Sequence, residues 1–204
     1  MEDNCKVHGV RGVFEHIHIK RIADAFPEDE KEARAFGKFG HLIGKVHKAF
    51  SRKIHVIKPF KIDVKKFSCI MALDPHPRKP HMAIWVQVTP DDTLQQVAEL
   101  EVGGGAEDLR DAVERTEELY GWRSVRRIMD PNMGRSPSGA VRGITWQDEF
   151  ARVSLVCDLA DDGDPGRARF NELLKPDIVS GKPRFVSSVD CPRTHFQLKR
   201  YVWD

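Results

Sequence analysis

Two aspartates in this sequence each follow a short apolar segment that is typical of a strand. Asp74 comes directly after residues 69–73 (CIMAL), and Asp130 comes directly after residues 125–129 (VRRIM). Two carboxylates held a few ångströms apart repel each other unless they share a proton or bind a cation. Mg²⁺ or Mn²⁺ would suit such a pair, because both are hard ions that prefer oxygen ligands. Two of these ions, roughly 4 Å apart, can activate water and stabilise the leaving oxygen of a phosphodiester.

Asp74 and Asp130 are therefore the candidate catalytic residues and metal ligands, with Asp74 bridging two ions and Asp130 holding one of them. Each aspartate is also followed by proline, at Pro75 and Pro131. An aspartate before proline often serves only to form a turn. Turn formation is the better interpretation of one such pair alone, whereas two of them, each at the end of a strand, favour a metal site.

The elements that must position these aspartates can be predicted from hydrophobic periodicity. Strands are expected at residues 67–73, 82–88, 94–102, 124–129 and 185–189. Helices are expected at residues 107–120, 145–151, 165–174 and 192–201. Three antiparallel strands followed by crossover units are the order of a ribonuclease H-like fold, an α/β class with a mixed five-stranded sheet flanked by helices. The crossover rule makes the fourth strand parallel to the first. If these two strands pair, Asp74 and Asp130 lie at the same edge of the sheet.

Residues 1–65 have a less regular pattern than the rest of the chain. We expect a strand at residues 14–19, a helix that starts at Pro27 and ends at Gly37, and a short strand at residues 54–57. We therefore expect residues 1–65 and residues 66–204 to be different parts of the chain, with one regular α/β domain at residues 66–204.

The overall charge is nearly balanced, with 33 Lys and Arg against 31 Asp and Glu. A DNA-binding function must therefore depend on local basic clusters. The candidates for phosphate contacts near the predicted sheet edge are Arg78, Lys79, Arg123, Arg126, Arg127 and Arg135. Arg135 lies in residues 132–139, which we expect to form a flexible surface loop, with ordering on DNA as the less common alternative. Solvated surface charge is the alternative interpretation of all these residues.

Several other kinds of site are not expected. The phosphate-loop pattern GxxxxGK followed by Ser or Thr is absent from the sequence, so this chain should hold no ATP site. The four cysteines have no CxxC spacing, which argues against a zinc site. No apolar run is long enough to span a membrane. His76 and His81 flank the turn after Asp74 and could contact phosphate, although turn formation is the more common role of such residues.

Several short motifs resemble a known family. Residues 30–39 (EKEARAFGKF) and 44–50 (GKVHKAF) resemble the segment that joins the ATPase and nuclease halves of the large subunit of tailed-phage terminases. Residues 72–77 (ALDPHP) look like the first nuclease motif of that family, and residues 128–131 (IMDP) are similar to the second. Two later segments, KPRF at 182–185 and KRYVWD at 199–204, resemble the region that follows.

The resemblance implies a linker or remnant of an upstream ATPase domain at residues 1–65 and a ribonuclease H-like nuclease domain at residues 66–204. This domain would be a metal-dependent endonuclease that cuts double-stranded concatemeric viral DNA, with Asp74 and Asp130 as ligands of Mg²⁺ or Mn²⁺. The resemblance also implies an upstream ATPase domain, portal protein and terminase small subunit as partners, with activity in the host cell cytoplasm and not in the mature virion. The family's third acid lies downstream of a Tyr-x-Trp stretch, here residues 201–203. We therefore expect the third ligand beyond Asp204, or else at Asp190 after the last strand.

Two alternatives remain open. Without a third acid, the chain would be a catalytically incomplete DNA-binding or motor-coupling fragment of the same protein, with salt-sensitive DNA binding that survives loss of both aspartates. A different ribonuclease H-like nuclease, such as a resolvase or transposase, would have a similar strand order. The terminase-like segment at residues 30–50 argues against that second alternative.

Overall fold

A computed structural model describes residues 5–7, 12–24, 44–59, 66–123, 125–139, 142–161, 164–178 and 180–202. The chain divides into two compact units, residues 1–46 with 200–204, and residues 47–199. In the first unit, α1 (His16–Asp24) is a helix, so the strand predicted at residues 14–19 is wrong. The sequence positions 19, 22 and 23 are apolar and have the i, i+3, i+4 spacing of a helix face, which a window ending at residue 19 misses. The helix predicted after Pro27 lies outside the described residues.

The second unit is built on a seven-stranded mixed sheet with the order β1-β7-β4-β3-β2-β5-β6. The strands are β1 (Val56–Ile57), β2 (Ser68–Asp74), β3 (His81–Val88), β4 (Leu94–Val102), β5 (Val125–Met129), β6 (Asp158–Leu159) and β7 (Phe185–Ser188). The five strands predicted between residues 67 and 189 are all present as β2, β3, β4, β5 and β7. The α/β class with a mixed sheet is confirmed. Two further strands of two residues each, β1 and β6, extend the sheet at its two ends.

The segment predicted as a strand at residues 54–57 begins as a helical turn. α3 (Arg52–His55) precedes β1, which pairs in parallel with β7. Residues 52–57 are therefore part of the unit that contains the sheet. The functional division expected between residues 65 and 66 stays a prediction.

The pairing that the sequence analysis depends on is present. β2 and β5 are parallel neighbours with Leu73 opposite Met129, and the Asp130 amide donates a hydrogen bond of 3.1 Å to the Leu73 carbonyl. β2 and β3 form the predicted hairpin, with Asp74 opposite Met82. Asp74 and Asp130 therefore follow adjacent strands at one edge of the sheet.

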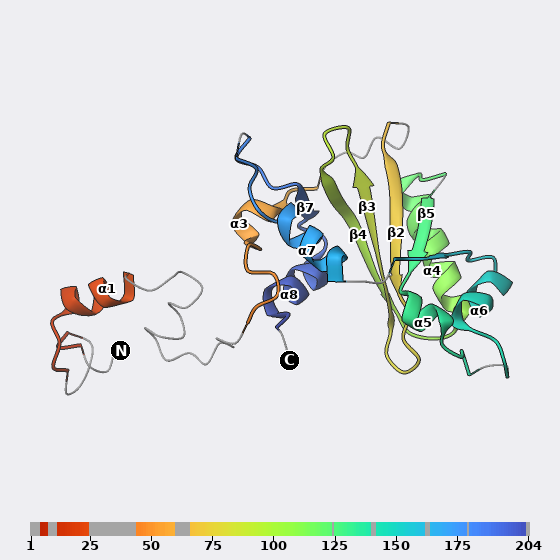
Figure 1. The fold of residues 1–204 in the computed structure, drawn as a ribbon, viewed down its shortest axis with the longest axis horizontal. Coiled ribbons are helices and arrows are strands. Elements are labelled where there is room, and N and C mark those ends of the chain that lie inside the picture. The colour runs from red at the N-terminus through yellow and green to blue at the C-terminus, as the bar shows by residue number, and fades with distance from the viewer. Residues whose placement is uncertain are drawn as a thin grey trace. The chain divides into compact units, whose positions relative to one another are not determined.

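Helices cover both faces of this sheet, as Figure 1 shows for α4, α5 and α6 beside β2 and β5 and for α7 and α8 beside β4 and β7. Their bounds are α4 (Ala106–Tyr120), α5 (Pro131–Arg135), α6 (Trp146–Arg152), α7 (Asp164–Leu173) and α8 (Pro192–Arg200). On the first face, Leu73 and Trp85 pack with Leu109 of α4 and Phe150 of α6 in the main core. On the second face, Phe185 packs with Leu198 of α8 in a smaller core. None of the described helices is long and apolar enough to cross a membrane.

Residues 131–135 form the helix α5, so the prediction of a continuous loop at residues 132–139 is wrong. Pro131 occupies the first turn of α5, where its fixed φ and missing N–H are no disadvantage. Asp130 caps the helix, because its Oδ1 accepts a hydrogen bond of 2.8 Å from the Met133 amide. The glycine and serine residues of this segment favour a loop, whereas Asp130 followed by Pro131 is a typical helix start.

Candidate active site

Asp74 is the last residue of β2, and its position follows from the alternation of that strand. Leu73 is buried in the main core, so Asp74 points to the opposite, second face and is exposed. Asp130 follows Met129, which is buried on the first face, and is half-buried at the start of α5. Asp130 therefore does form a turn, as the alternative interpretation held, but its cap uses Oδ1 and leaves the carboxylate a second oxygen.

The two carboxylates influence each other electrostatically. The pKa of Asp74 is raised, first because the surrounding protein desolvates the carboxylate and second because the Asp130 carboxylate repels its negative charge. His76 and His81 act in the opposite direction and lower this pKa. A divalent cation at this edge would relieve the repulsion, so the donor chemistry of the pair fits such an ion. Among the described residues, however, no group of three His, Cys, Asp or Glu side chains is arranged to hold a metal.

His76 and His81 organise the hairpin that follows Asp74. The Nδ1 atom of His76 accepts hydrogen bonds from the amides of Arg78 (3.0 Å) and Lys79 (2.9 Å). The amide of His76 donates to Nδ1 of His81 at 3.1 Å, and the His81 ring is buried against Trp146. Burial lowers the pKa of His81, which keeps the ring neutral and able to accept this bond. These histidines therefore fix the backbone that carries Arg78 and Lys79.

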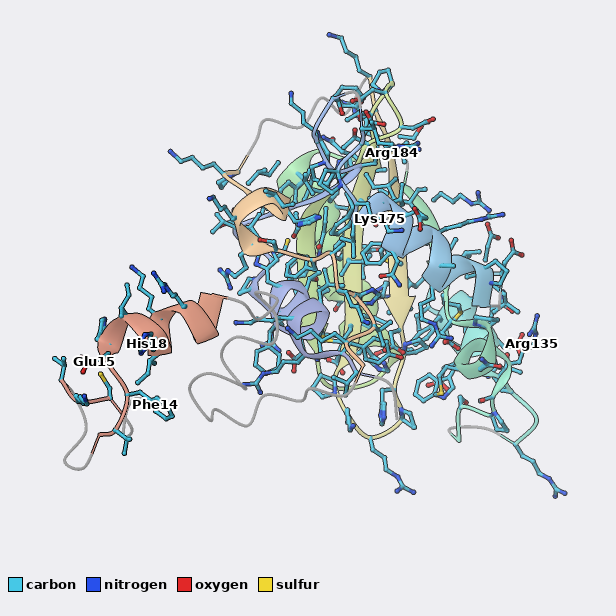
Figure 2. The ribbon with its side chains drawn as sticks, turned by 60° about the vertical axis from the view of Figure 1, so that its left-hand side comes forward. Phe14, Glu15, His18, Arg135, Lys175 and Arg184 are labelled. Carbon is cyan, nitrogen blue, oxygen red and sulfur yellow. The ribbon has the colours of Figure 1, made fainter. Side chains whose placement is uncertain are left out.

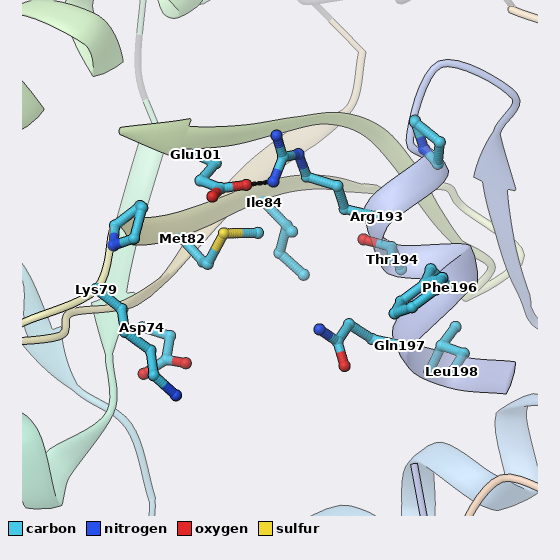
Figure 3. A pocket seen from close by; sticks show the side chains of 12 residues that line it. Asp74, Lys79, Met82, Ile84, Glu101, Arg193, Thr194, Phe196, Gln197 and Leu198 are labelled. Carbon is cyan, nitrogen blue, oxygen red and sulfur yellow. Dashed lines mark ion pairs between the residues drawn. The ribbon is translucent and has the colours of Figure 1, made fainter. Parts of the chain in front are cut away.

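The structure separates the predicted DNA-binding residues. Lys79 lies beside Asp74 on the second face (Figure 3). Arg126 is on the same face by its register with Ile70, and its exposed Nε is 3.7 Å from the Asp158 carboxylate. Arg135 ends α5 (Figure 2). Arg78, Lys79, Arg126 and Arg135 all stay predicted phosphate contacts.

Arg127 is placed differently, because it alternates with Arg126 and lies on the first face. Its Nε is 3.2 Å from Oε1 of Glu117, a buried residue of α4. The indole N–H of Trp85 donates to the same carboxylate oxygen at 3.3 Å. Arg127 thus joins β5 to α4, and its predicted contact with DNA stays a prediction.

Beside Asp74, the second face forms a groove of ≈ 810 Å³ (Figure 3). Met82 and Ile84 of β3 form its floor, and Phe196 and Gln197 of α8 form the opposite wall. The sequence analysis missed this groove, because it depends on α8 packing against strands about a hundred positions earlier in the chain.

α8 is held in place by two acids of β4. The Glu99 carboxylate accepts hydrogen bonds from the backbone amides of Arg193 (2.8 Å) and Thr194 (2.9 Å), and Glu101 forms an ion pair with Arg193. The register between β3 and β4 shifts at Trp85/Val86, so Val97 and Ala98 are both buried in the main core. This bulge turns Glu99 and Glu101 toward the second face. The alternation of Glu99 and Glu101 with Leu100 and Val102 was a signal that could have found them.

Comparisons with solved structures find a similar fold in large terminases of bacteriophages. The nuclease domain of the P22 large terminase matches with a TM-score of 0.58 and 14% identity, over 79% of this chain and 80% of that one. A large terminase from a thermophilic bacteriophage matches with a TM-score of 0.57 and 14% identity, over 97% of this chain but only 47% of that one. No family model matches the sequence, and no curated protein matches it.

The chain therefore spans about half the length of the thermophilic-phage terminase. At 14% identity the similarity concerns the fold. The strand order, the parallel β2–β5 pair and these neighbours together give one conclusion: the chain has the ribonuclease H-like fold of phage large-terminase nuclease domains.

Proposed function

We propose that the chain is the nuclease domain of a phage large terminase, which cuts double-stranded concatemeric viral DNA by metal-dependent hydrolysis of a phosphodiester. The observation that carries this proposal is the parallel pairing of β2 and β5, which brings Asp74 and Asp130 to one edge. A raised pKa at Asp74 supports it, because perturbed carboxylates gather at sites that bind cations or do chemistry.

In this proposal Asp74 and Asp130 would hold divalent cations, Mg²⁺ or Mn²⁺. The chemistry that the bound ions supply is activation of water and stabilisation of the leaving oxygen. Lys79 and Arg78 contact phosphates on either side of the cut, and the hydrogen bonds of His76 keep the hairpin from moving while they do so. Arg126 and Arg135 extend the phosphate contacts along the DNA.

Asp190 is a poor candidate for the third ligand. It follows β7, and β4 and β3 lie between β7 and β2. Three steps of about 4.8 Å between neighbouring strands place Asp190 roughly 14 Å from Asp74, too far for a shared ion. Its carboxylate instead accepts a hydrogen bond of 3.2 Å from the Ser188 hydroxyl. We therefore propose a third ligand outside the described residues.

The proposal includes the partners of a packaging motor. These are an upstream ATPase domain of the same protein, portal protein and terminase small subunit, meeting viral DNA in the host cell cytoplasm. One structure of the thermophilic-phage large terminase contains ATP-γ-S, and this chain spans 46% of that protein. The ATPase function is accordingly proposed for a separate domain of the complete protein.

Cleavage of supercoiled plasmid tests the proposal. The chain is incubated with plasmid in Mn²⁺, in Mg²⁺ and in EDTA, beside its Asp74→Ala variant. We expect nicking or linearisation with metal alone, reduced at least about 100-fold in the variant, since removing a ligand disables the site. Equal cleavage by a folded Asp74→Ala variant would overturn the assignment.

A second function has one observation in its favour, the lack of a three-ligand group among the described residues. The chain would then be a DNA-binding or motor-coupling fragment without cleavage activity. It would bind duplex DNA with an affinity that falls steeply with salt, and this binding would survive loss of both aspartates. Cleavage that needs Asp74 excludes this alternative.

A further inference from the structure

The groove beside Asp74 is charged on one side and apolar on its floor and on the other side. Asp74 and the Lys79 ammonium lie on one side, so a phosphate held at the metal pair would also meet a cation there (Figure 3). The floor is apolar, formed by Met82 and Ile84. Across the groove, the ring of Phe196 is 51% exposed. A molecule that fits must therefore carry a phosphate at one end and a flat apolar body at the other.

Gln197 adds a polar group to this surface. Figure 3 shows its side-chain amide directed into the space between α8 and Asp74. An amide offers two donors and an acceptor, which match the edge of a nucleobase. The phosphate contact comes from the end of β2 and the hairpin after it, whereas the aromatic surface and the amide both come from α8, and all of them line the same groove.

We propose that this groove binds one unpaired nucleotide of the DNA, next to the phosphate that lies at Asp74 and Asp130. The proposal rests on the nuclease function above and deepens it by naming the state of the substrate. In it, the base stacks on Phe196 over the apolar floor, and Gln197 hydrogen-bonds to its edge. Aromatic stacking of this kind tolerates any base, so it adds affinity with little sequence preference.

The size of the groove supports a single nucleotide over an intact duplex. Sites for one small molecule range over roughly 300–1,000 Å³, and the groove of ≈ 810 Å³ lies within that range. A base can enter only after it leaves the stack of the double helix. Unstacking costs free energy, least where the duplex is already mismatched or open. The protein should therefore prefer DNA with a local unpaired position.

The test uses DNA carrying 2-aminopurine, whose fluorescence changes when the base leaves the stack of the double helix. Two 20–30 base-pair probes are compared, one with a single unpaired 2-aminopurine and one fully paired. Binding is measured in EDTA, so that no cleavage intervenes. We expect tighter binding of the unpaired probe, with a change in fluorescence that the paired probe does not show. Phe196→Ala should weaken this binding about 5- to 100-fold, the size of a lost base–aromatic contact, and leave binding of the paired probe unchanged.

Three variants serve as controls. Phe196→Tyr keeps an aromatic face and should bind as the original does. Leu119→Ala removes another exposed apolar side chain, 82% exposed on α4 over the other face of the sheet, and should change nothing. Asp190→Asn should bind both probes as the original does, because Asp190 does not line the groove.

Equal binding of both probes, or equal losses in Phe196→Ala and Leu119→Ala, would overturn the proposal. A failure of the nuclease function alone gives a different result. In that case no plasmid is cut, while the selective loss in Phe196→Ala persists. Asp74-dependent cleavage with a Phe196→Ala variant that binds both probes normally would refute the groove and leave the nuclease intact.

Discussion

At the scale of single residues, repulsion between the Asp74 and Asp130 carboxylates destabilises the folded state. Asp74 is held where desolvation and the Asp130 charge both raise its pKa. The folded state therefore binds a proton at Asp74 more tightly than the unfolded state does. Stability from this group is present at low pH and is lost as pH rises from the unfolded pKa through the folded one. Cation-binding sites often contain carboxylates that repel each other in this way, and a bound metal ion removes the repulsion.

Replacing Asp74 by Asn should stabilise the metal-free protein at pH 7. The gain should be about 1 kcal/mol or less, because the side chain is exposed and solvent screens the repulsion. This gain in stability should become smaller as pH falls toward about 4, where the aspartate of the unfolded chain is itself protonated. Urea unfolding in EDTA from pH 5 to pH 8 measures this difference. A variant less stable than the original at pH 7 would contradict the repulsion.

Two adjacent arginines illustrate how alternation along a strand assigns different roles. Both were candidates for phosphate contact, but Arg127 pairs with buried Glu117 whereas Arg126 is exposed beside Asp158. Arg127→Ala should destabilise the domain by about 2–4 kcal/mol, because it leaves the buried Glu117 charge without its cationic partner. Arg126→Ala should change stability by less than about 1 kcal/mol. Urea unfolding of both variants checks this, and equal losses would refute the distinction.

At the scale of elements, α8 depends on β4 for its position. Glu99 acts as a cap supplied by a strand, since it accepts the bonds of two amides in the first turn of α8. The buried hydroxyl of Ser187 lies 2.9 Å from Nε2 of His195 and adds a second attachment on β7. The groove exists because these contacts hold Phe196 and Gln197 opposite Asp74.

Glu99→Ala should therefore destabilise the domain by about 1–2 kcal/mol, the usual loss when a helix N-terminus loses its cap. Glu99→Gln keeps an acceptor oxygen and should lose less than half of that. The midpoint of urea unfolding compares the two. Identical midpoints for Glu99→Ala and the original chain would show that α8 does not need this cap.

The same elements show what the sequence could and could not predict. β2, β3 and β4 were found because their apolar residues alternate or run continuously over seven to nine positions. β1 was predicted only as part of a longer strand at residues 54–57, and β6, with two residues, leaves no periodic signal. α5 was mistaken for a loop because its glycine and serine neighbours outweighed the Asp130-Pro131 start signal. Asp74 and Asp130 were predicted from local sequence plus one topological rule, whereas the groove required contacts such as Glu99 to Thr194 that no local pattern contains.

At the scale of the whole molecule, the fold matches large-terminase nuclease regions from phage P22 and from a thermophilic phage at low sequence identity. The chain spans only 47% of the thermophilic-phage terminase. Packaging partners and DNA specificity are therefore proposals for the complete protein.

The central claim is that Asp74 and Asp130 together hold divalent cations. Calorimetric titration of Mn²⁺ into the original chain, Asp74→Asn, Asp130→Asn and Asp190→Asn tests it most directly; asparagine at 130 still caps α5. We predict binding by the original chain and by Asp190→Asn, and at least about tenfold weaker binding in each of the other two, since each loses a charged oxygen ligand. If the original chain binds no Mn²⁺, or if Asp74→Asn or Asp130→Asn binds it as well as the original does, the two aspartates do not form the proposed metal site.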